Sequence, residues 1–132
     1  MQTPKQLITL TKEHHLSLSL ANKAINAKKL GNETTICQLI IETFERDLLS
    51  HFVFEEQHIL PLLKQHNQQD CQRIIDEHKC LLNLAKHINA GNLLEFGELL
   101  KTHTRFEDRV LFKKISTDNL NKIPVHPIVK NQ

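Results

Sequence analysis

The chain has 132 residues, and its 17 basic and 15 acidic residues give a formal net charge of +2. This length fits one domain that buries its own core, and the interspersed charges disfavour a nucleic-acid-binding patch or tail. No apolar stretch reaches the roughly 20 residues that cross a bilayer, and the N-terminus lacks the apolar run of a signal peptide, so we expect a soluble, cytoplasmic protein without a membrane partner.

The composition favours helices. Three glycines and four prolines punctuate the chain, and Trp and Tyr are absent. The three cysteines, Cys37, Cys71 and Cys80, form no C-x-x-C pair, so we interpret them as ordinary thiols in a reducing compartment. Nine histidines are far more than the average share for this length. Their positions therefore carry most of the functional information.

The first two predicted helices follow from apolar residues that recur every three or four positions. One helix is predicted over residues 4–29, ending near Gly31, and Asn32 suits the N-cap of a second helix. The inner stripe of this second helix contains a histidine and a glutamate among apolar residues. Pro61 is expected to kink this helix rather than stop it, and residues 61–69 are predicted to form its end and a turn.

The last two predicted helices occupy the second half of the chain. A third helix is predicted over residues 70–90, ending at Gly91 in the left-handed conformation that glycine tolerates. Asn92, with Glu95 three residues later, resembles a capping arrangement that opens the fourth helix. This helix carries a second histidine and glutamate on its inner stripe and is expected to end near Ile115.

Four helices of similar length joined by short turns predict an all-α fold, an antiparallel up-down-up-down four-helix bundle over residues 1–115. The remaining residues, 116–132, contain Pro124 and Pro127 and are predicted to form a short irregular C-terminal tail. This tail is expected either to be disordered or to lie along the bundle through Val125, Ile128 and Val129.

Two histidine–glutamate pairs lie on the apolar stripes of the second and fourth predicted helices. His51 and Glu55 are four residues apart, as are His103 and Glu107, so each pair lies on one helix face about one turn apart. A carboxylate buried among apolar residues is costly unless a cation or a hydrogen-bond network compensates it. Metal coordination explains both pairs economically.

Helix geometry predicts that ligand-type residues of all four helices lie at one depth. With a rise of about 1.5 Å per residue, His14 and His51 lie about 26 and 29 Å from the turn between the first two helices. His78 and His103 each lie about 19 Å from the turn between the last two. The four histidines and the two glutamates are therefore expected to meet in one layer.

This set of side chains is too large for one tetrahedral zinc ion but suits two ions bridged by the carboxylates. Nitrogen and oxygen donors without thiolate favour iron, and manganese and zinc would also suit them. The predicted metal ligands are His14, His51, Glu55, His78, His103 and Glu107.

Four stretches of the chain resemble the hemerythrin-like, or HHE cation-binding, domain over about residues 5–115: EHHLSLSLA, HFVFEEQHILPLL, EHKCLLNLA and HTRFEDRVLF. The resemblance implies an antiparallel four-helix bundle with an oxo- or hydroxo-bridged di-iron centre. Carried over by motif, the four histidines named above would be imidazole ligands and the two glutamates the bridging carboxylates.

The chain also departs from the oxygen-carrying members of that family. Their fifth histidine, one turn before the ligand of the third helix, is replaced by Ile74. This departure disfavours dedicated oxygen transport, and the remaining set resembles the di-iron proteins of iron–sulfur repair, nitrosative stress and iron sensing. Two assignments stay open: His15 is the alternative to His14, and Asp108, at the position where the oxygen carriers place an aspartate, is the alternative to Glu107.

Our main functional hypothesis is a non-haem di-iron protein that binds oxygen, nitric oxide or iron for sensing, storage or stress protection. One alternative is a metal-dependent oxidoreductase or hydrolase that uses a metal-activated water and needs an organic substrate pocket. Another is a helical interaction module with a vestigial metal site. No protein partner is identified by the sequence.

Overall fold

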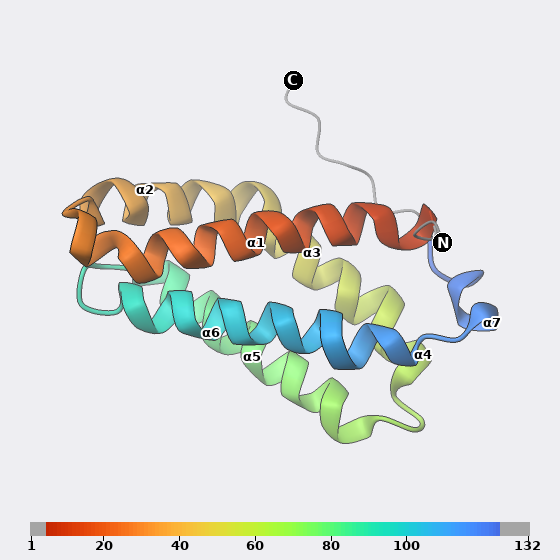
Figure 1. The fold of residues 1–132 in the computed structure, drawn as a ribbon. Helices are drawn as coiled ribbons and strands as arrows, with labels where there is room; N and C mark the ends of the chain where they lie inside the picture. Colours follow the sequence, from red (N-terminus) through yellow and green to blue (C-terminus); the bar gives the residue numbers. More distant parts are fainter. Residues whose placement is uncertain (1–4, 125–132) are drawn as a thin grey trace.

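The computed structural model describes residues 5–124, which form four antiparallel helical segments (Figure 1). The first segment is α1 (Lys5–Leu30) and the third is α5 (Gln68–Lys86). The second runs through five consecutive elements: α2 (Glu33–Thr43), η1 (Phe44–Leu48), α3 (Leu49–Phe54), η2 (Glu55–Ile59) and α4 (Leu60–Leu63). The fourth consists of α6 (Leu93–Phe106), η3 (Glu107–Leu111) and η4 (Phe112–Lys114), and a short α7 (Thr117–Leu120) follows.

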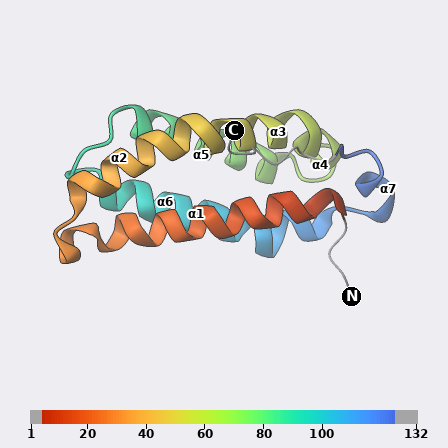
Figure 2. The ribbon, with the colours of Figure 1, turned by 90° about the horizontal axis from the view of Figure 1, so that it is seen from above.

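The segments have the predicted up-down-up-down connectivity. The turn between α1 and α2 and the loop between α5 and α6 lie at one end of the bundle, and the loop between α4 and α5 lies at the other (Figures 1 and 2). The all-α fold class is therefore confirmed. Within the described residues, no helix has the length and apolar character to cross a membrane.

The segments α1 and α6 approach each other closely at small residues. A Cβ atom built on Gly97 of α6 would lie 2.8 Å from the backbone oxygen of Ala21 and 2.9 Å from the Cβ of Ala24, both on α1. Any side chain at position 97 would push the two helices apart. Gly97 therefore sets the distance between the helices that supply His14 and His103.

Two predicted helix ends have different outcomes. Gly31 has a φ of +67°, so it ends α1 in the left-handed conformation. The predicted end of the third helix at Gly91 is wrong, because α5 ends at Lys86. The Asn89 side chain causes this early end: its Oδ1 accepts from the backbone N–H groups of Gly91 and Asn92, so the loop replaces the last helical turn.

The two predicted N-cap residues have the right positions but lack the expected hydrogen bonds. Asn32 precedes α2 and Asn92 precedes α6, yet neither side chain bonds to its own helix. The Asn92 Oδ1 instead accepts from the backbone N–H of Asn89, and its Nδ2 donates to the backbone oxygen of His87. The predicted capping arrangement of Asn92 with Glu95 is therefore wrong, because the preceding loop uses the Asn92 side chain.

Three π-helical turns interrupt the second and fourth segments. Two of them, η2 and η3, begin at Glu55 and Glu107, whose carbonyl oxygens accept from the N–H groups of Leu60 and Phe112, five residues later. Pro61 is the second residue of α4, two positions after the end of η2, and the helix continues through it, as predicted. The wider turn relieves the clash that a proline ring makes with the carbonyl four residues earlier in an α-helix.

Two apolar clusters fill the bundle on either side of a buried polar layer. The large cluster lies towards the end with the α1–α2 turn and contains Leu20, Ala21, Ala24, Ala27, Ile36, Ile40, Phe44, Leu48, Phe52, Leu81, Leu84, Ala85, Leu93, Phe96 and Leu100. The small cluster lies towards the other end and contains Leu10, Phe54, Ile59, Leu60, Leu63, Cys71, Ile74, Leu111 and Ile123.

The described part of the predicted tail is partly ordered into a helical turn. Ser116 Oγ accepts from the backbone N–H of Asn119 and so caps α7. Ile123 is buried in the small cluster, so this segment covers the end of the bundle. The expected contacts of Val125, Ile128 and Val129 lie outside the described residues.

Candidate metal centre

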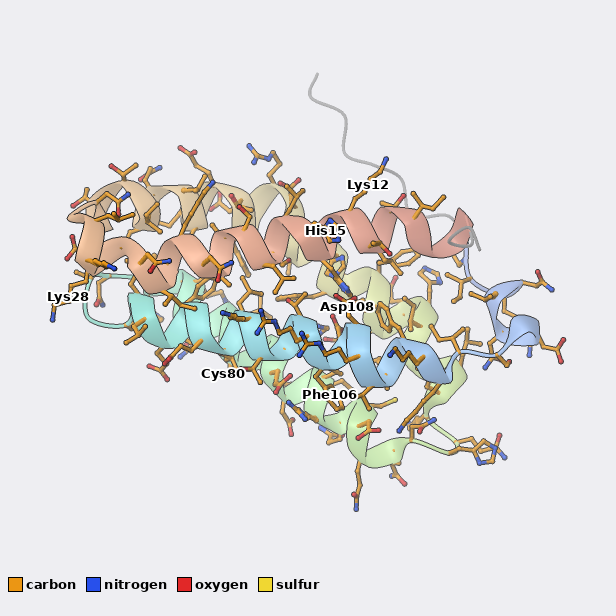
Figure 3. All side chains as sticks on the ribbon, viewed as in Figure 1. Lys12, His15, Lys28, Cys80, Phe106 and Asp108 are labelled. Atoms are coloured by element: carbon orange, nitrogen blue, oxygen red, sulfur yellow. The ribbon has the colours of Figure 1, made fainter. Side chains whose placement is uncertain are left out.

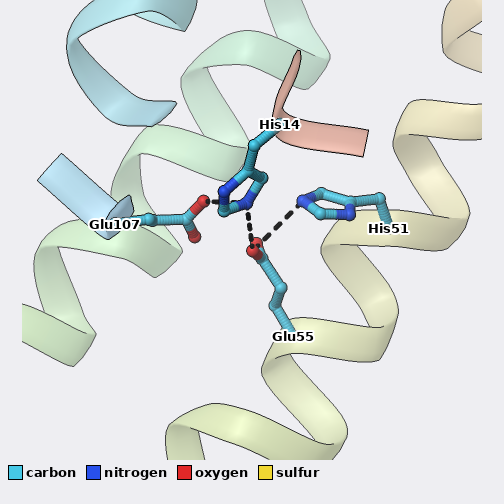
Figure 4. A group of neighbouring side chains, drawn as sticks. All are labelled: His14, His51, Glu55 and Glu107. Atoms are coloured by element: carbon cyan, nitrogen blue, oxygen red, sulfur yellow. Dashed lines mark hydrogen bonds and ion pairs between the residues drawn. The ribbon is translucent and has the colours of Figure 1, made fainter. Parts of the chain in front are cut away.

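All six residues predicted as metal ligands meet in one layer between the two apolar clusters. None of the six is more than 2% exposed, although all are polar or charged. They come from all four helical segments: His14 from α1, His51 from α3, Glu55 from η2, His78 from α5, His103 from α6 and Glu107 from η3. Figure 4 shows four of them, His14, His51, Glu55 and Glu107, pointing toward one another.

The layer divides into two groups of four side chains that share both carboxylates. One group is His14, His51, Glu55 and Glu107, and the other is His78, His103, Glu55 and Glu107; the ligand atoms of each group lie within 4.8 Å of one another. Donors on opposite sides of a metal ion at about 2.1 Å are about 4.2 Å apart. Each group therefore needs only a small contraction to surround a cation.

The Nε2 atoms of the four imidazoles face the two carboxylates. Oε2 of Glu55 lies 3.1 Å from His51 Nε2 and 3.3 Å from His14 Nε2, and its Oε1 lies 3.1 Å from His78 Nε2. Glu107 lies 3.1 Å from His14 Nε2 and 3.6 Å from His103 Nε2. Glu55 is thus the centre of the layer, with imidazoles from three segments around it.

The Nδ1 atom of each imidazole points away from the centre and meets an outer carboxylate. The four contacts are His14 with Asp108 at 2.6 Å, His51 with Glu13 at 2.7 Å, His78 with Glu56 at 2.6 Å, and His103 with Glu77 at 2.8 Å. Each outer carboxylate adjoins a layer residue on one segment and bonds to the histidine of the next. The four contacts therefore close a ring around the bundle.

This ring sets the tautomer of the imidazoles. A carboxylate can only accept, so each Nδ1 carries a proton and donates it outward. In a neutral imidazole the inward Nε2 then has a free lone pair, the form in which histidine binds a metal ion. The outer carboxylates also restrict the rotation of the rings, so the four Nε2 atoms are aimed before any ion binds.

The two alternatives to His14 and Glu107 lie outside the layer. His14 is buried in the layer and His15 is exposed on α1. Glu107 lies in the layer, whereas Asp108 is 39% exposed and accepts from His14 Nδ1. Figure 3 labels His15 and Asp108, and shows Asp108 on the side of the fourth segment that faces α1.

Two of the four outer carboxylates were anticipated from the sequence and two were missed. Glu56 and Asp108 each follow a layer glutamate in the sequence, a position typical of a surface charge or of an acceptor from a ligand histidine, and they are acceptors. Glu13 and Glu77 were overlooked. The available signal was their position, because each directly precedes a layer histidine in the sequence.

Several atoms of the layer have no hydrogen-bond partner, which tests whether a cation fits. Within the described residues, His103 Nε2 and both carboxylate oxygens of Glu107 are buried and form no hydrogen bond. Unpartnered buried groups of this kind are costly. A cation between them would satisfy all three atoms at once, so the residues present fit a metal centre.

The layer also perturbs the proton affinities of its members in the metal-free protein. Burial alone would raise the pKa of Glu55, but the charge of His51 and hydrogen bonds from three histidines hold it well below its usual range. Burial and the charge of Glu55 raise the pKa of Glu107. Burial opposes the charged form of His51, yet Glu55 and Glu13 outweigh it and raise the pKa of His51 to about 10. A metal ion must therefore displace protons from the imidazoles.

Aromatic rings pack against the outer faces of the imidazoles. Phe52 stacks on His78, with ring centroids 4.0 Å apart and planes inclined by 15°, and Phe112 stacks on His14 at 5.2 Å. Both phenylalanines therefore form part of the wall of the layer.

A small cavity of about 20 Å³ reaches the layer beside Glu13, Ser17 and His51. It has room for a molecule of about the size of water.

Comparison with known proteins identifies the family of this chain. The family model described as the hemerythrin HHE cation binding domain matches residues 7–115, which span all six residues of the layer and all four outer carboxylates. No curated protein and no solved structure matches the chain significantly. The matched region covers most of the chain, and this chain therefore belongs to the hemerythrin HHE cation-binding family.

Proposed function

We propose that this chain binds two iron ions in the buried layer. Its role would be sensing, storage or stress protection, through binding of oxygen or nitric oxide at the iron or through binding of the iron itself. The observation that carries the proposal is the pair of four-residue groups that share Glu55 and Glu107. The proposed ligands are His14, His51, Glu55, His78, His103 and Glu107.

Each proposed position offers two imidazole nitrogens and one oxygen from each shared carboxylate. This mixed set without thiolate suits iron, and manganese and zinc remain alternatives. Iron bound there would supply one-electron redox chemistry and the binding of a diatomic molecule. The chain's own contribution is to aim the four Nε2 atoms through the outer carboxylates and to exclude water with the apolar clusters on both sides.

The small cavity lined by His51 favours a small ligand rather than an organic substrate. The cavity beside Glu13 and His51 has a volume of about 20 Å³, which is far below the several hundred cubic ångströms of a typical pocket for an organic ligand. One turn before His78, Ile74 is completely buried in the small apolar cluster. The oxygen-carrying members of the family have a fifth histidine at this position. A hydrocarbon side chain there therefore supports a role other than dedicated oxygen transport.

The test of this proposal is metal content followed by reactivity. The purified chain would be loaded with Fe²⁺ without oxygen, desalted and analysed for iron, and we expect two ions per chain. Exposure to oxygen or to nitric oxide should then change the near-ultraviolet and visible absorbance. His51→Leu should lower the iron content, whereas His58→Leu, in a histidine that packs against Phe54 outside the layer, should leave it unchanged. Less than one iron per wild-type chain would contradict the proposal.

A further inference from the structure

One outer carboxylate, Glu77, is held from both sides. Its Oε1 accepts from His103 Nδ1 at 2.8 Å, and its Oε2 accepts from the Nε of Arg73 at 3.0 Å. The guanidinium carbon of Arg73 also lies 3.8 Å from the centre of the Phe106 ring. Phe106 belongs to α6, three residues after His103, and Figure 3 shows it on the side of α6 that faces α5. Arg73 thus connects α5 to the helix that supplies His103.

The two contacts of Arg73 restrict Glu77 in different ways. The ion pair joins residues one turn apart on α5 and fixes the rotamer of the carboxylate. The stacked Phe106 ring fixes the guanidinium plane, because a cation above an aromatic face is held by the ring quadrupole. A lysine has neither the planar shape nor the directed N–H fork needed to make both contacts together.

We propose that Arg73 is a positioning residue for the metal position formed by His78 and His103, because it holds Glu77 against His103 Nδ1. The inference rests on the proposed function, since it assumes that the layer binds two ions. Glu77 is 15% exposed and Arg73 is 42% exposed. Without Arg73 the carboxylate is free to turn toward water, and His103 loses the partner that orients its Nε2.

A purely electrostatic role for Arg73 would have the opposite sign. The guanidinium is a positive charge near a proposed cation position, so its removal would strengthen metal binding if charge repulsion dominated. If positioning dominates, its removal weakens metal binding. The direction of the change therefore distinguishes the two roles.

The experiment is a stepwise titration of the metal-free full chain with Co²⁺, followed by calorimetry and visible absorbance. In Arg73→Met, which keeps an unbranched side chain against Phe106, we expect one of the two binding constants to fall about 3- to 10-fold. Glu77→Gln should lower the same constant about 10- to 100-fold, the range typical of a lost outer partner of a ligand histidine. Arg73→Lys should restore little, because it supplies charge without the fork.

A matched control is Arg46→Met. Arg46 forms an ion pair with Asp47 at the same 3.0 Å Nε–oxygen distance, but on η1 and away from Glu77. It should leave both constants unchanged. Because Arg46 is 53% exposed and Arg73 is 42% exposed, neither truncation removes a core side chain.

Two further measurements show whether Arg73→Met acts on metal binding through Glu77 and His103. In the Co²⁺ protein, each bound imidazole should give a shifted, exchangeable Nδ1–H proton resonance, and Arg73→Met should speed the exchange of the His103 resonance alone. In the Glu77→Gln background, Arg73→Met should have no further effect on the binding constants. Unchanged or tighter binding in Arg73→Met, full rescue by Arg73→Lys, or an undiminished effect in Glu77→Gln would overturn the inference. A wild-type chain that fails to bind two ions would instead contradict the proposed function.

Discussion

The large apolar cluster and the polar layer are both almost completely excluded from water, but burial stabilises the first and costs hydration free energy in the second. In the cluster every side chain gains from burial, and Gly97 allows α1 and α6 to approach until Ala21 and Ala24 meet the α6 backbone. In the layer, two carboxylates and four imidazoles lose their hydration, and three of their atoms find no hydrogen-bond partner. The same four segments carry both regions.

This contrast separates the part of the chain that holds the fold from the part that binds. The large cluster packs all four segments together without any contribution from a metal ion. The layer loses hydration on folding, and protons on its imidazoles or a bound cation must compensate its carboxylates. Variants of the layer should therefore alter metal binding while the fold persists, and variants of the cluster should alter stability while the layer keeps its ligands.

The largest effect should come from Glu55→Gln, because Glu55 is shared by both four-residue groups and contacts three of the four imidazoles. An amide has no negative charge to bridge two cations. We expect the iron content after anaerobic loading to fall from two per chain to one or fewer. Helical circular dichroism should persist. Glu45→Gln, an exposed carboxylate on the same segment, is the control.

A large effect should also appear in the pH dependence of the metal-free protein. The pKa of His51 is about 10 in the folded chain, against 6.5 for a free histidine. The folded state therefore binds more protons than the unfolded state between these values, and its stability must fall as the pH rises. The raised pKa of Glu107 acts in the same direction above the ordinary carboxylate range. Urea unfolding with chelator present should show a loss of about 2–3 kcal/mol between pH 7 and pH 9.

The iron-loaded protein provides the comparison for this measurement. Where a metal ion occupies Nε2, no proton is bound there, so the loss of stability between pH 7 and pH 9 should largely disappear. His51→Leu should also reduce the change in the unfolding free energy of the metal-free protein between pH 7 and pH 9. A metal-free stability that stays constant from pH 7 to pH 9 would refute this account of the layer.

The cluster should respond to Gly97→Ala. The added methyl group would lie 2.8 Å from the Ala21 backbone oxygen, so α1 and α6 must separate. Overpacking of this kind outweighs the better helix propensity of alanine, and we expect a loss of about 2 kcal/mol in urea unfolding. Gly91→Ala is the control, because there the nearest atom is the tip of the Asn89 side chain. Iron content of the folded Gly97→Ala protein should stay at two, unlike that of Glu55→Gln.

The sequence alone predicted most of the layer, for a physical reason. Histidines and carboxylates on apolar stripes are conspicuous, and the constant rise of a helix converts residue numbers into depth, which placed His14, His51, His78 and His103 level with one another. The outer carboxylates Glu13 and Glu77 escaped notice because charged residues beside a stripe are ordinary on a solvent face. Only the packing of neighbouring helices shows that they accept from the histidines of the next segment.

The features that the sequence did not predict depend on local hydrogen-bond competition. The π-helical turns η2 and η3 have no composition signal, yet they begin at the two shared carboxylates. The early end of α5 results from the Asn89 side chain, which takes the N–H groups of Gly91 and Asn92. A choice between two nearly equal sets of hydrogen bonds is decided by the folded context rather than by residue type.

The smallest expected effect on metal affinity comes from a residue just outside the layer, Asp108. Glu107 and Asp108 are adjacent, and helical geometry turns one carboxylate inward and the other toward His14 Nδ1. Asp108→Asn keeps an oxygen acceptor at that position but removes its charge. We therefore expect two ions still to bind, with about a 10-fold loss of affinity, or about 1.4 kcal/mol.

Glu107→Gln is the matched comparison, since it changes the neighbouring carboxylate by the same chemistry. It removes a shared carboxylate and should therefore cost more metal affinity than Asp108→Asn. If Asp108→Asn proved the more damaging of the two to metal binding, the roles of these neighbours would have to be exchanged.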